Sequence, residues 1–230
     1  MKKIIIAAVK SWNISNARIF QKENLKKYQT TIYSQQEDLT YQNIKKINPD
    51  YIFIPHWSWI IPSEIYSNFK CIIFHTSDLP YGRGGSPIQN QIIRGIKESK
   101  VCAIQCNSEI DAGDVYCKEN VYLGRGNADE ILIEISDIIF KKMIPHIIEN
   151  EPASTPQLGE ATTFKRRNKL QSNIQMNTIE NLDLLYDFIR MLDGEDYPPA
   201  YIELNNLKIY FSNVTKRGNR LEGRFEIHES

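Results

Sequence analysis

Three features that would assign a chain to a common class are missing from this 230-residue sequence. First, its 28 Lys and Arg balance its 28 Asp and Glu, so the formal net charge is zero. Because affinity for nucleic acid rests largely on neutralising phosphates, this balance predicts no nucleic-acid partner. Second, no stretch approaches the ~18 apolar residues of a membrane helix. Third, Lys10 ends the apolar run Ile4–Val9 and no small-residue cleavage site follows, so we expect a cytoplasmic protein without a signal peptide or membrane partner.

The sequence is also poor in cysteine. Its four cysteines are Cys71, Cys102, Cys106 and Cys117. They form no Cys-x-x-Cys pair and have no histidine cluster beside them, whereas structural zinc needs four ligands at tight spacing. We therefore expect no metal and interpret the thiols as buried and reduced. Walker A and Gly-x-Gly-x-x-Gly sequences are absent too, which argues against nucleotide binding by those devices.

Short apolar runs alternate with helical patterns through residues 1–150. The expected strands are Lys3–Val9, Tyr51–Pro55, Cys71–His75, Val101–Cys106 and Asp114–Lys118, and the expected helices are Asn16–Lys27, Ser86–Gly95 and Asn127–Glu149. This alternation predicts an α/β fold, with a Rossmann-like, mostly parallel sheet and helices on both faces. In such sheets a ligand binds beyond the carboxyl ends of the strands.

The remaining residues are predicted to form an extended linker, 151–175, and a small α+β appendage, 176–230. Asn177-Thr-Ile-Glu180 has the spacing of a capping box and predicts a helix that runs to about Leu192. Short strands are expected at Tyr201–Leu204, Leu207–Asn213 and Leu221–Ile227. Because so few residues bury little core alone, the appendage is expected to pack on the first domain or to form a homodimer with a second subunit.

Two segments carry candidate chemistry. His75 ends an apolar strand and is followed by a Pro- and Gly-rich loop, through Tyr81-Gly-Arg-Gly-Gly-Ser-Pro87, that opens into a helix. Glycines let backbone approach a ligand closely. Asp111 lies in the turn Asp111-Ala-Gly-Asp114, some 36 residues after His75. Each segment on its own is also explained as an ordinary turn, so the residues alone leave both interpretations open.

Together, in this order, the two segments resemble the folate-dependent formyltransferase family. Members carry Asn-x-His-x-Ser-x-Leu-Pro followed by Arg-Gly, and many continue to a Leu-Asp-x-Gly-Asp loop. The chain matches with His75, Ser77, Leu79, Pro80, Arg83 and Gly84, and then with Asp111, Gly113 and Asp114. Upstream, Trp57-Ser-Trp-Ile-Ile-Pro62 resembles the stretch that helps to line the folate pocket. The resemblance spans about residues 1–175.

The resemblance implies an N-formyltransferase that uses 10-formyltetrahydrofolate as co-substrate and no metal. It gives His75 the role of proton carrier and polariser of the oxyanion, for which an unperturbed imidazole is suited near neutral pH. Asp111 would hold the imidazole tautomer and stabilise an imidazolium. The implied folate contacts are Trp57, Ser58, Ile60, Ile61, Asp78, Ile110, Ala112 and Asp114.

For the acceptor, the chain is similar to bacterial nucleotide-sugar N-formyltransferases of the pseudaminic-acid pathway type. That likeness predicts transfer to the amino group of a UDP-linked 4-amino-4,6-dideoxy sugar. The residues assigned to the sugar nucleotide are Lys10, Trp12, Asn13, Arg83, Gly84 and Gly85. The tail 151–230 holds 10 Lys and Arg against 12 Asp and Glu, a net charge of −2, which disfavours a tRNA-binding appendage. Two alternatives stay open: another amine, such as a tRNA- or carrier-linked amino acid, and folate binding without turnover.

One position departs from the family pattern. The asparagine two residues before the histidine, which hydrogen-bonds the formyl oxygen in the family, is Ile73 here. Losing one oxyanion donor typically costs roughly 2.7–4 kcal/mol of transition-state stabilisation. His56 is the first candidate for a replacement donor, although a structural hydrogen bond to backbone would explain it as well. Ser58, Thr76 and a fixed water are the further alternatives.

Overall fold

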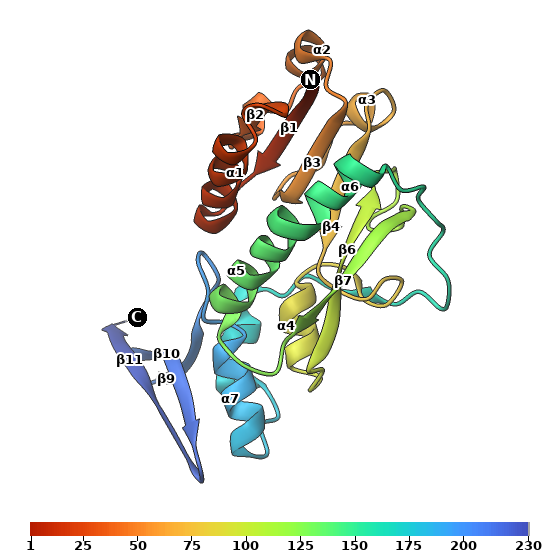
Figure 1. Cartoon of the computed structure of the whole chain (residues 1–230). Helices are drawn as coiled ribbons and strands as arrows, with labels where there is room; N and C mark the ends of the chain where they lie inside the picture. Colours follow the sequence, from red (N-terminus) through yellow and green to blue (C-terminus); the bar gives the residue numbers. More distant parts are fainter. Residues whose placement is uncertain (230) are drawn as a thin grey trace. The chain divides into compact units, whose positions relative to one another are not determined.

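The structure, a computed structural model, describes every residue except Ser230 (Figure 1). Its elements in chain order are β1 Lys2–Ala8, α1 Ser11–Glu23, β2 Tyr28–Tyr33, η1 Gln36–Asp38, α2 Tyr41–Ile47, β3 Tyr51–His56, α3 Ser63–Tyr66, β4 Cys71–His75, β5 Arg83–Gly84, α4 Pro87–Ile92, β6 Glu98–Gln105, β7 Val115–Tyr122, α5 Ala128–Ile138, η2 Ile139–Met143, α6 Ile144–Asn150, β8 Thr163–Phe164, η3 Lys169–Ser172, η4 Ile174–Met176, α7 Leu182–Arg190, β9 Ala200–Leu204, β10 Leu207–Arg217 and β11 Arg220–Glu229.

The main sheet has the strand order β2-β1-β3-β4-β6-β7. Strand β1 pairs in parallel with β2 and β3, and β3 pairs in parallel with β4, whereas β6 runs antiparallel to β4. The carboxyl ends of β3 and β4 therefore meet at one edge of the sheet. The prediction of a Rossmann-like, mostly parallel sheet with helices is confirmed.

Helices cover both faces of this sheet because its central strands are apolar on both sides. On one face, Ile5 and Ile52 pack in a cluster with Ile44 of α2 and Ile65 of α3. On the other face lie α1 and η2, whose Phe20 and Phe140 rings are 6.4 Å apart. Figure 1 shows α1 and α6 on the same side of the strands. Burial on both faces explains the continuous apolar runs that made these strands recognisable.

The expected helix Asn127–Glu149 is present as one helical run, with the π-turn η2 between α5 and α6. Pro145 lies two residues beyond η2, in the first turn of α6, and has no N–H to donate, so the hydrogen-bond ladder is adjusted there.

Other predicted boundaries were wrong. Helix α1 begins five residues earlier than expected, because Lys10 at φ 74° turns the chain directly into it. The capping box at 177–180 does not form, because α7 begins only at Leu182. The Asn177 amide N–H groups donate to the carbonyls of Gln171 and Asn173. Asn181 caps α7 instead, accepting from the Leu184 N–H. Elements β2, α2 and α3 were not predicted at all.

The chain divides into two compact units that interleave in sequence. One comprises Met1–Arg83, Lys100–Val121 and Ile133–Thr163, and the other comprises the remaining segments. The second contains α7 and the antiparallel sheet β11-β10-β9, with α7 packed on β10. The predicted division at residues 150 and 175 stays a prediction. Within the described residues, no helix combines the length and apolar character needed to cross a membrane.

Candidate active site

The side chain of His75 lies at the carboxyl end of β4 and is 8% exposed. Its Nδ1 is 3.3 Å from a carboxylate oxygen of Asp111, and its Nε2 is 2.8 Å from the carbonyl oxygen of Gly82. A carbonyl can only accept, so Nε2 carries the hydrogen in this contact. The ring is thus held between two acceptors, and the structure brings together the two residues that the sequence singled out.

The loop after β4 holds the Gly82 carbonyl in place. The Ser77 hydroxyl lies 2.7 Å from the Tyr81 carbonyl and 3.1 Å from the Gly82 carbonyl, and can donate to either. The Gly82 N–H donates to Thr162 Oγ1 at 2.7 Å. Gly82 adopts φ 72°, the left-handed region that favours glycine. This part of the loop therefore orients the histidine through backbone groups.

The turn that carries Asp111 is packed tightly on β6. Asp111 itself has φ 53°, and its side chain is 15% exposed. A Cβ on Gly113 would lie only 1.7 Å from the Gln105 carbonyl oxygen, so no other residue fits there without movement. The Gln105 N–H donates to the Asp114 carbonyl at 2.8 Å.

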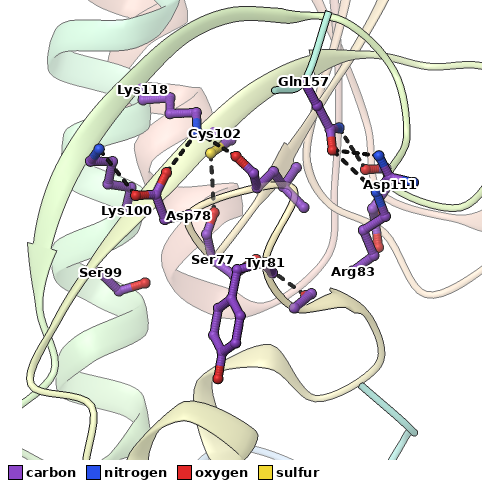
Figure 2. A network of polar contacts seen from close by, with 12 residues as sticks. Ser77, Asp78, Tyr81, Arg83, Ser99, Lys100, Cys102, Asp111, Lys118 and Gln157 are labelled. Atoms are coloured by element: carbon purple, nitrogen blue, oxygen red, sulfur yellow. Dashed lines mark hydrogen bonds and ion pairs between the residues drawn. The ribbon is translucent and has the colours of Figure 1, made fainter. Parts of the chain in front are cut away.

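Arg83 is engaged by another side chain. Its Nε and Nη2 donate to the Gln157 amide oxygen at 3.1 and 2.8 Å, as Figure 2 shows. The expected role of Arg83 toward a substrate stays a prediction. Gly84 forms β5 with Arg83. Gly85, in the second unit, allows a close approach, since a Cβ there would lie 2.6 Å from the Arg166 Cα.

Asp78 lies between two lysines on neighbouring strands. Its carboxylate accepts from Lys118 at 2.6 Å and pairs with Lys100 at 3.1 Å (Figure 2). Burial raises the pKa of this carboxyl, but the two ammonium groups outweigh that effect and bring the Asp78 pKa below its ordinary value. These contacts give Asp78 a structural role, and its predicted folate contact remains untested.

The expected folate-contacting segments follow β3 and β6. Trp57 and Trp59 meet edge to face at 5.0 Å, and Trp57 and Ile61 pack on the core under α2 and α3. Ser58 is exposed, and so are Ile60, at 93%, and Ile110, at 77%. Ala112 and Asp114 are half-buried beside Asp111. Their contact with folate stays a prediction.

His56 and Ile73 lie on adjacent strands. Ile54 pairs with Ile73, and His56 and His75 end these two strands two residues further on. Ile73 packs into two apolar clusters, as an aliphatic strand residue should. The arrangement is compatible with His56 as the replacement donor, and that role remains a prediction.

The N-terminal residues assigned to a substrate lie at the start of α1. Lys10 precedes the helix, and Trp12 and Asn13 are buried in its first turn. Within the described residues, the amide oxygen of Asn13 is buried without a hydrogen-bond partner. Leaving such a group unpaired costs about 1–3 kcal/mol.

Sequence reasoning missed Gln157 and Thr162, which contact the loops that carry Asp111 and Gly82. Both residues lie in the polar segment interpreted as a linker. The one local signal for Gln157 in the sequence is the proline before it, and a Pro-Gln pair is common in loops.

Comparison with known proteins identifies the class. Residues 9–132 match the family model described as formyl transferase, and residues 169–228 match the model described as methionyl-tRNA formyltransferase, C-terminal domain. The first match covers more than half of the chain, so the chain belongs to the formyl transferase family. The prediction of this family and of its enzyme class is confirmed.

Three relatives show which members of the family this chain resembles. A methionyl-tRNA formyltransferase from Clostridium thermocellum is 48% identical, with a TM-score of 0.97 and 100% of both chains covered. A methionyl-tRNA formyltransferase from Sulfurihydrogenibium sp. is 28% identical over 84% of this chain and 60% of its own. One from Buchnera aphidicola subsp. Schizaphis graminum is 30% identical over 90% of this chain and 64% of its own. The chain thus spans less than two thirds of these two curated relatives.

These findings correct the predicted acceptor. A sugar N-formyltransferase from Shewanella sp. has a TM-score of 0.69 but is only 17% identical, which reflects the fold alone. The predictions of a nucleotide-sugar substrate of the pseudaminic-acid type and of no nucleic-acid partner are wrong. The motif around His75 belongs to the whole family, so it could not separate one acceptor from another. The net charge of the tail averages over its surface and does not report a local phosphate contact.

Proposed function

We propose that this chain transfers the formyl group of 10-formyltetrahydrofolate to the amino group of methionyl-tRNA. The observation that carries the proposal is the 48% identity to the Clostridium thermocellum methionyl-tRNA formyltransferase over the full length of both chains. The match of residues 169–228 to the C-terminal domain of such enzymes supports the same acceptor.

In the proposed reaction, the amino nitrogen attacks the formyl carbon and a tetrahedral intermediate forms. The bond from that carbon to N10 of the folate then breaks, leaving the formyl amide and tetrahydrofolate. The amine loses one proton and N10 gains one, so the reaction needs a proton carrier. His75 is the proposed carrier, and Asp111, 3.3 Å from Nδ1, stabilises the imidazolium that forms.

The pterin is proposed to lie against the segments that follow β3 and β6, namely 57–61 and 110–114. Segment 57–61 follows the carboxyl end of β3, where ligands of such sheets bind. Segment 110–114 carries Asp111, whose carboxylate lies 3.3 Å from His75 Nδ1. Asn13 is a proposed polar contact for a substrate, because its buried amide oxygen has no partner within the described residues.

The test is a transfer assay with the purified chain, 10-formyltetrahydrofolate and methionyl-tRNA. Formyl-methionyl-tRNA should accumulate, and His75→Ala should lower kcat by at least ~10²-fold, as expected for loss of a positioned acid–base group. Uncharged tRNA serves as the control acceptor and should give no product. Tight folate binding without product from methionyl-tRNA would instead favour the folate-binding alternative that Ile73 motivates.

A further inference from the structure

The segment 155–162 crosses the first unit between the two loops that hold His75 and Asp111, and we call it the strap. At its start, the Thr155 backbone pairs with Val115, with N···O distances of 2.8 and 2.9 Å. At its end, Thr162 Oγ1 accepts from the Gly82 N–H, and the Gly82 carbonyl faces His75 Nε2. The strap is therefore anchored beside both members of the catalytic pair.

Gln157 is the strap residue that reaches the Asp111 turn. Its Nε2 donates to the carbonyl oxygens of Asp111 and Gly113 at 2.8 and 2.9 Å, and its Oε1 accepts two bonds from Arg83 (Figure 2). Both N–H groups and both acceptor sites of the amide are thereby used. A flipped amide would point N–H at a guanidinium and oxygen at two carbonyls, so only one orientation fits.

The Asp111 turn needs such a restraint. Asp111 adopts φ 53°, in the left-handed region that favours glycine and that aspartate enters more readily than most other residues. Its neighbour Ile110 is 77% exposed and so gives little packing support. The contact from Asp111 to His75 Nδ1, at 3.3 Å, is already longer than the 2.7–2.9 Å typical of a strong charge-assisted bond. A small outward movement of the turn would therefore break it.

We propose that Gln157 is a positioning residue that holds the Asp111 carboxylate against His75. It acts through the Asp111 and Gly113 carbonyls, with Arg83 fixing the amide from the other side. The inference rests on the proposed function for its kinetic consequence, whereas the placement of Asp111 against His75 is measurable without turnover.

The kinetic test compares Gln157→Glu and Gln157→Ala with the wild-type chain. The carboxylate of Gln157→Glu still accepts from Arg83 but cannot donate to the two carbonyls. Both variants should lower kcat by about ten- to a hundredfold, because a misplacement of about 1 Å can cost that much. KM for methionyl-tRNA should change less than kcat. KM for 10-formyltetrahydrofolate is no specific readout, because the pterin is proposed to lie against segment 110–114, which Gln157 holds. Leu158→Ala, at a strap side chain that is 86% exposed, is the matched control and should retain wild-type kcat.

The second readout is the ¹⁵N NMR signals of the His75 imidazole. In Gln157→Glu these signals should move from their wild-type positions toward those of Asp111→Asn, while circular dichroism shows an intact fold. Failure of the wild-type chain to formylate methionyl-tRNA would contradict the proposed function. The ¹⁵N signals of the His75 imidazole would still test the positioning role. Wild-type imidazole signals in Gln157→Glu would overturn the positioning role. Unfolding of both Gln157 variants would also overturn it, because the residue would then be structural.

Discussion

The imidazole of His75 has an oxygen acceptor at each nitrogen, the Asp111 carboxylate and the Gly82 carbonyl. The imidazolium, which has two N–H groups, is the form in which both contacts are hydrogen bonds. The two acceptors therefore fix the orientation of the ring. Asp111 contributes by charge and orientation, and Gly82 by orientation alone.

At the position of the family's oxyanion donor, Ile73 offers no N–H or O–H group. If His56 donates in its place, His56→Ala should lower kcat and kcat/KM together by about 10²-fold, the pattern of a bond made only in the transition state. Steady-state kinetics with 10-formyltetrahydrofolate varied would show it. Unchanged kinetics in a folded His56→Ala protein would discard this donor.

The double variant Ile73→Asn with His56→Ala extends the test. The asparagine restores the amide of the family pattern at its usual place, so part of the lost kcat should return. Thermal unfolding should accompany the measurement, because an unpaired amide on this packed strand costs about 1–3 kcal/mol.

At the scale of elements, the connection between β6 and β7 is the part of the site that tolerates a larger side chain least. Gly113 lies where a Cβ would meet the Gln105 carbonyl at 1.7 Å. Gly113→Ala should therefore displace the Asp111 turn, lower kcat by at least about tenfold and destabilise the fold by about 1–3 kcal/mol, as overpacking does.

Gly218→Ala is the control for that prediction. Gly218 has φ 58° in the turn between β10 and β11, with nothing within 4 Å of an added Cβ. The substitution should cost roughly 1–2 kcal/mol of backbone strain, so thermal stability should fall while kcat stays at the wild-type value. Equal kcat in Gly113→Ala and wild type would contradict the tight placement of the Asp111 turn.

Helices and strands were predictable from the sequence where the residues of one segment alone show an apolar run or a helical period. Strands β3 and β4 are short apolar runs between breakers, and their residues were predicted to within one position. Strand β2 was missed because Tyr28–Tyr33 lies at the sheet edge, where partly exposed polar residues interrupt the apolar pattern. The cap of α7 was misplaced because Asn177 and Asn181 both suit an N-cap, and only tertiary contacts decide between them.

The site was predictable to a similar degree. His75 and Asp111 could be paired because a family pattern spans the 36 residues between them. Gln157 could not, since it joins residues 46 and 74 positions away and nothing in a polar segment marks such a contact. The motif suggested a folate contact for Asp78, and that contact stays a prediction. The pairing of its carboxylate with two lysines was not predictable from the motif.

At the scale of the whole molecule, the acceptor is where reasoning from composition was wrong. Zero net charge predicts no polyanionic partner, yet phosphate contacts depend on where cations gather on the surface. The tail is net acidic but includes Lys165-Arg166-Arg167, a local basic cluster of the kind that net charge conceals. The identity to methionyl-tRNA formyltransferases is the stronger guide to the acceptor.

This 230-residue chain spans only part of its curated relatives. The most direct measurement is the stoichiometry of the reaction with methionyl-tRNA, followed in one reaction as formyl-methionyl-tRNA formed and tetrahydrofolate released. The two products should appear in equal amounts, and the formation of both should depend on His75. Release of tetrahydrofolate without a formylated acceptor, or no release at all from a folded chain that binds folate, would contradict it.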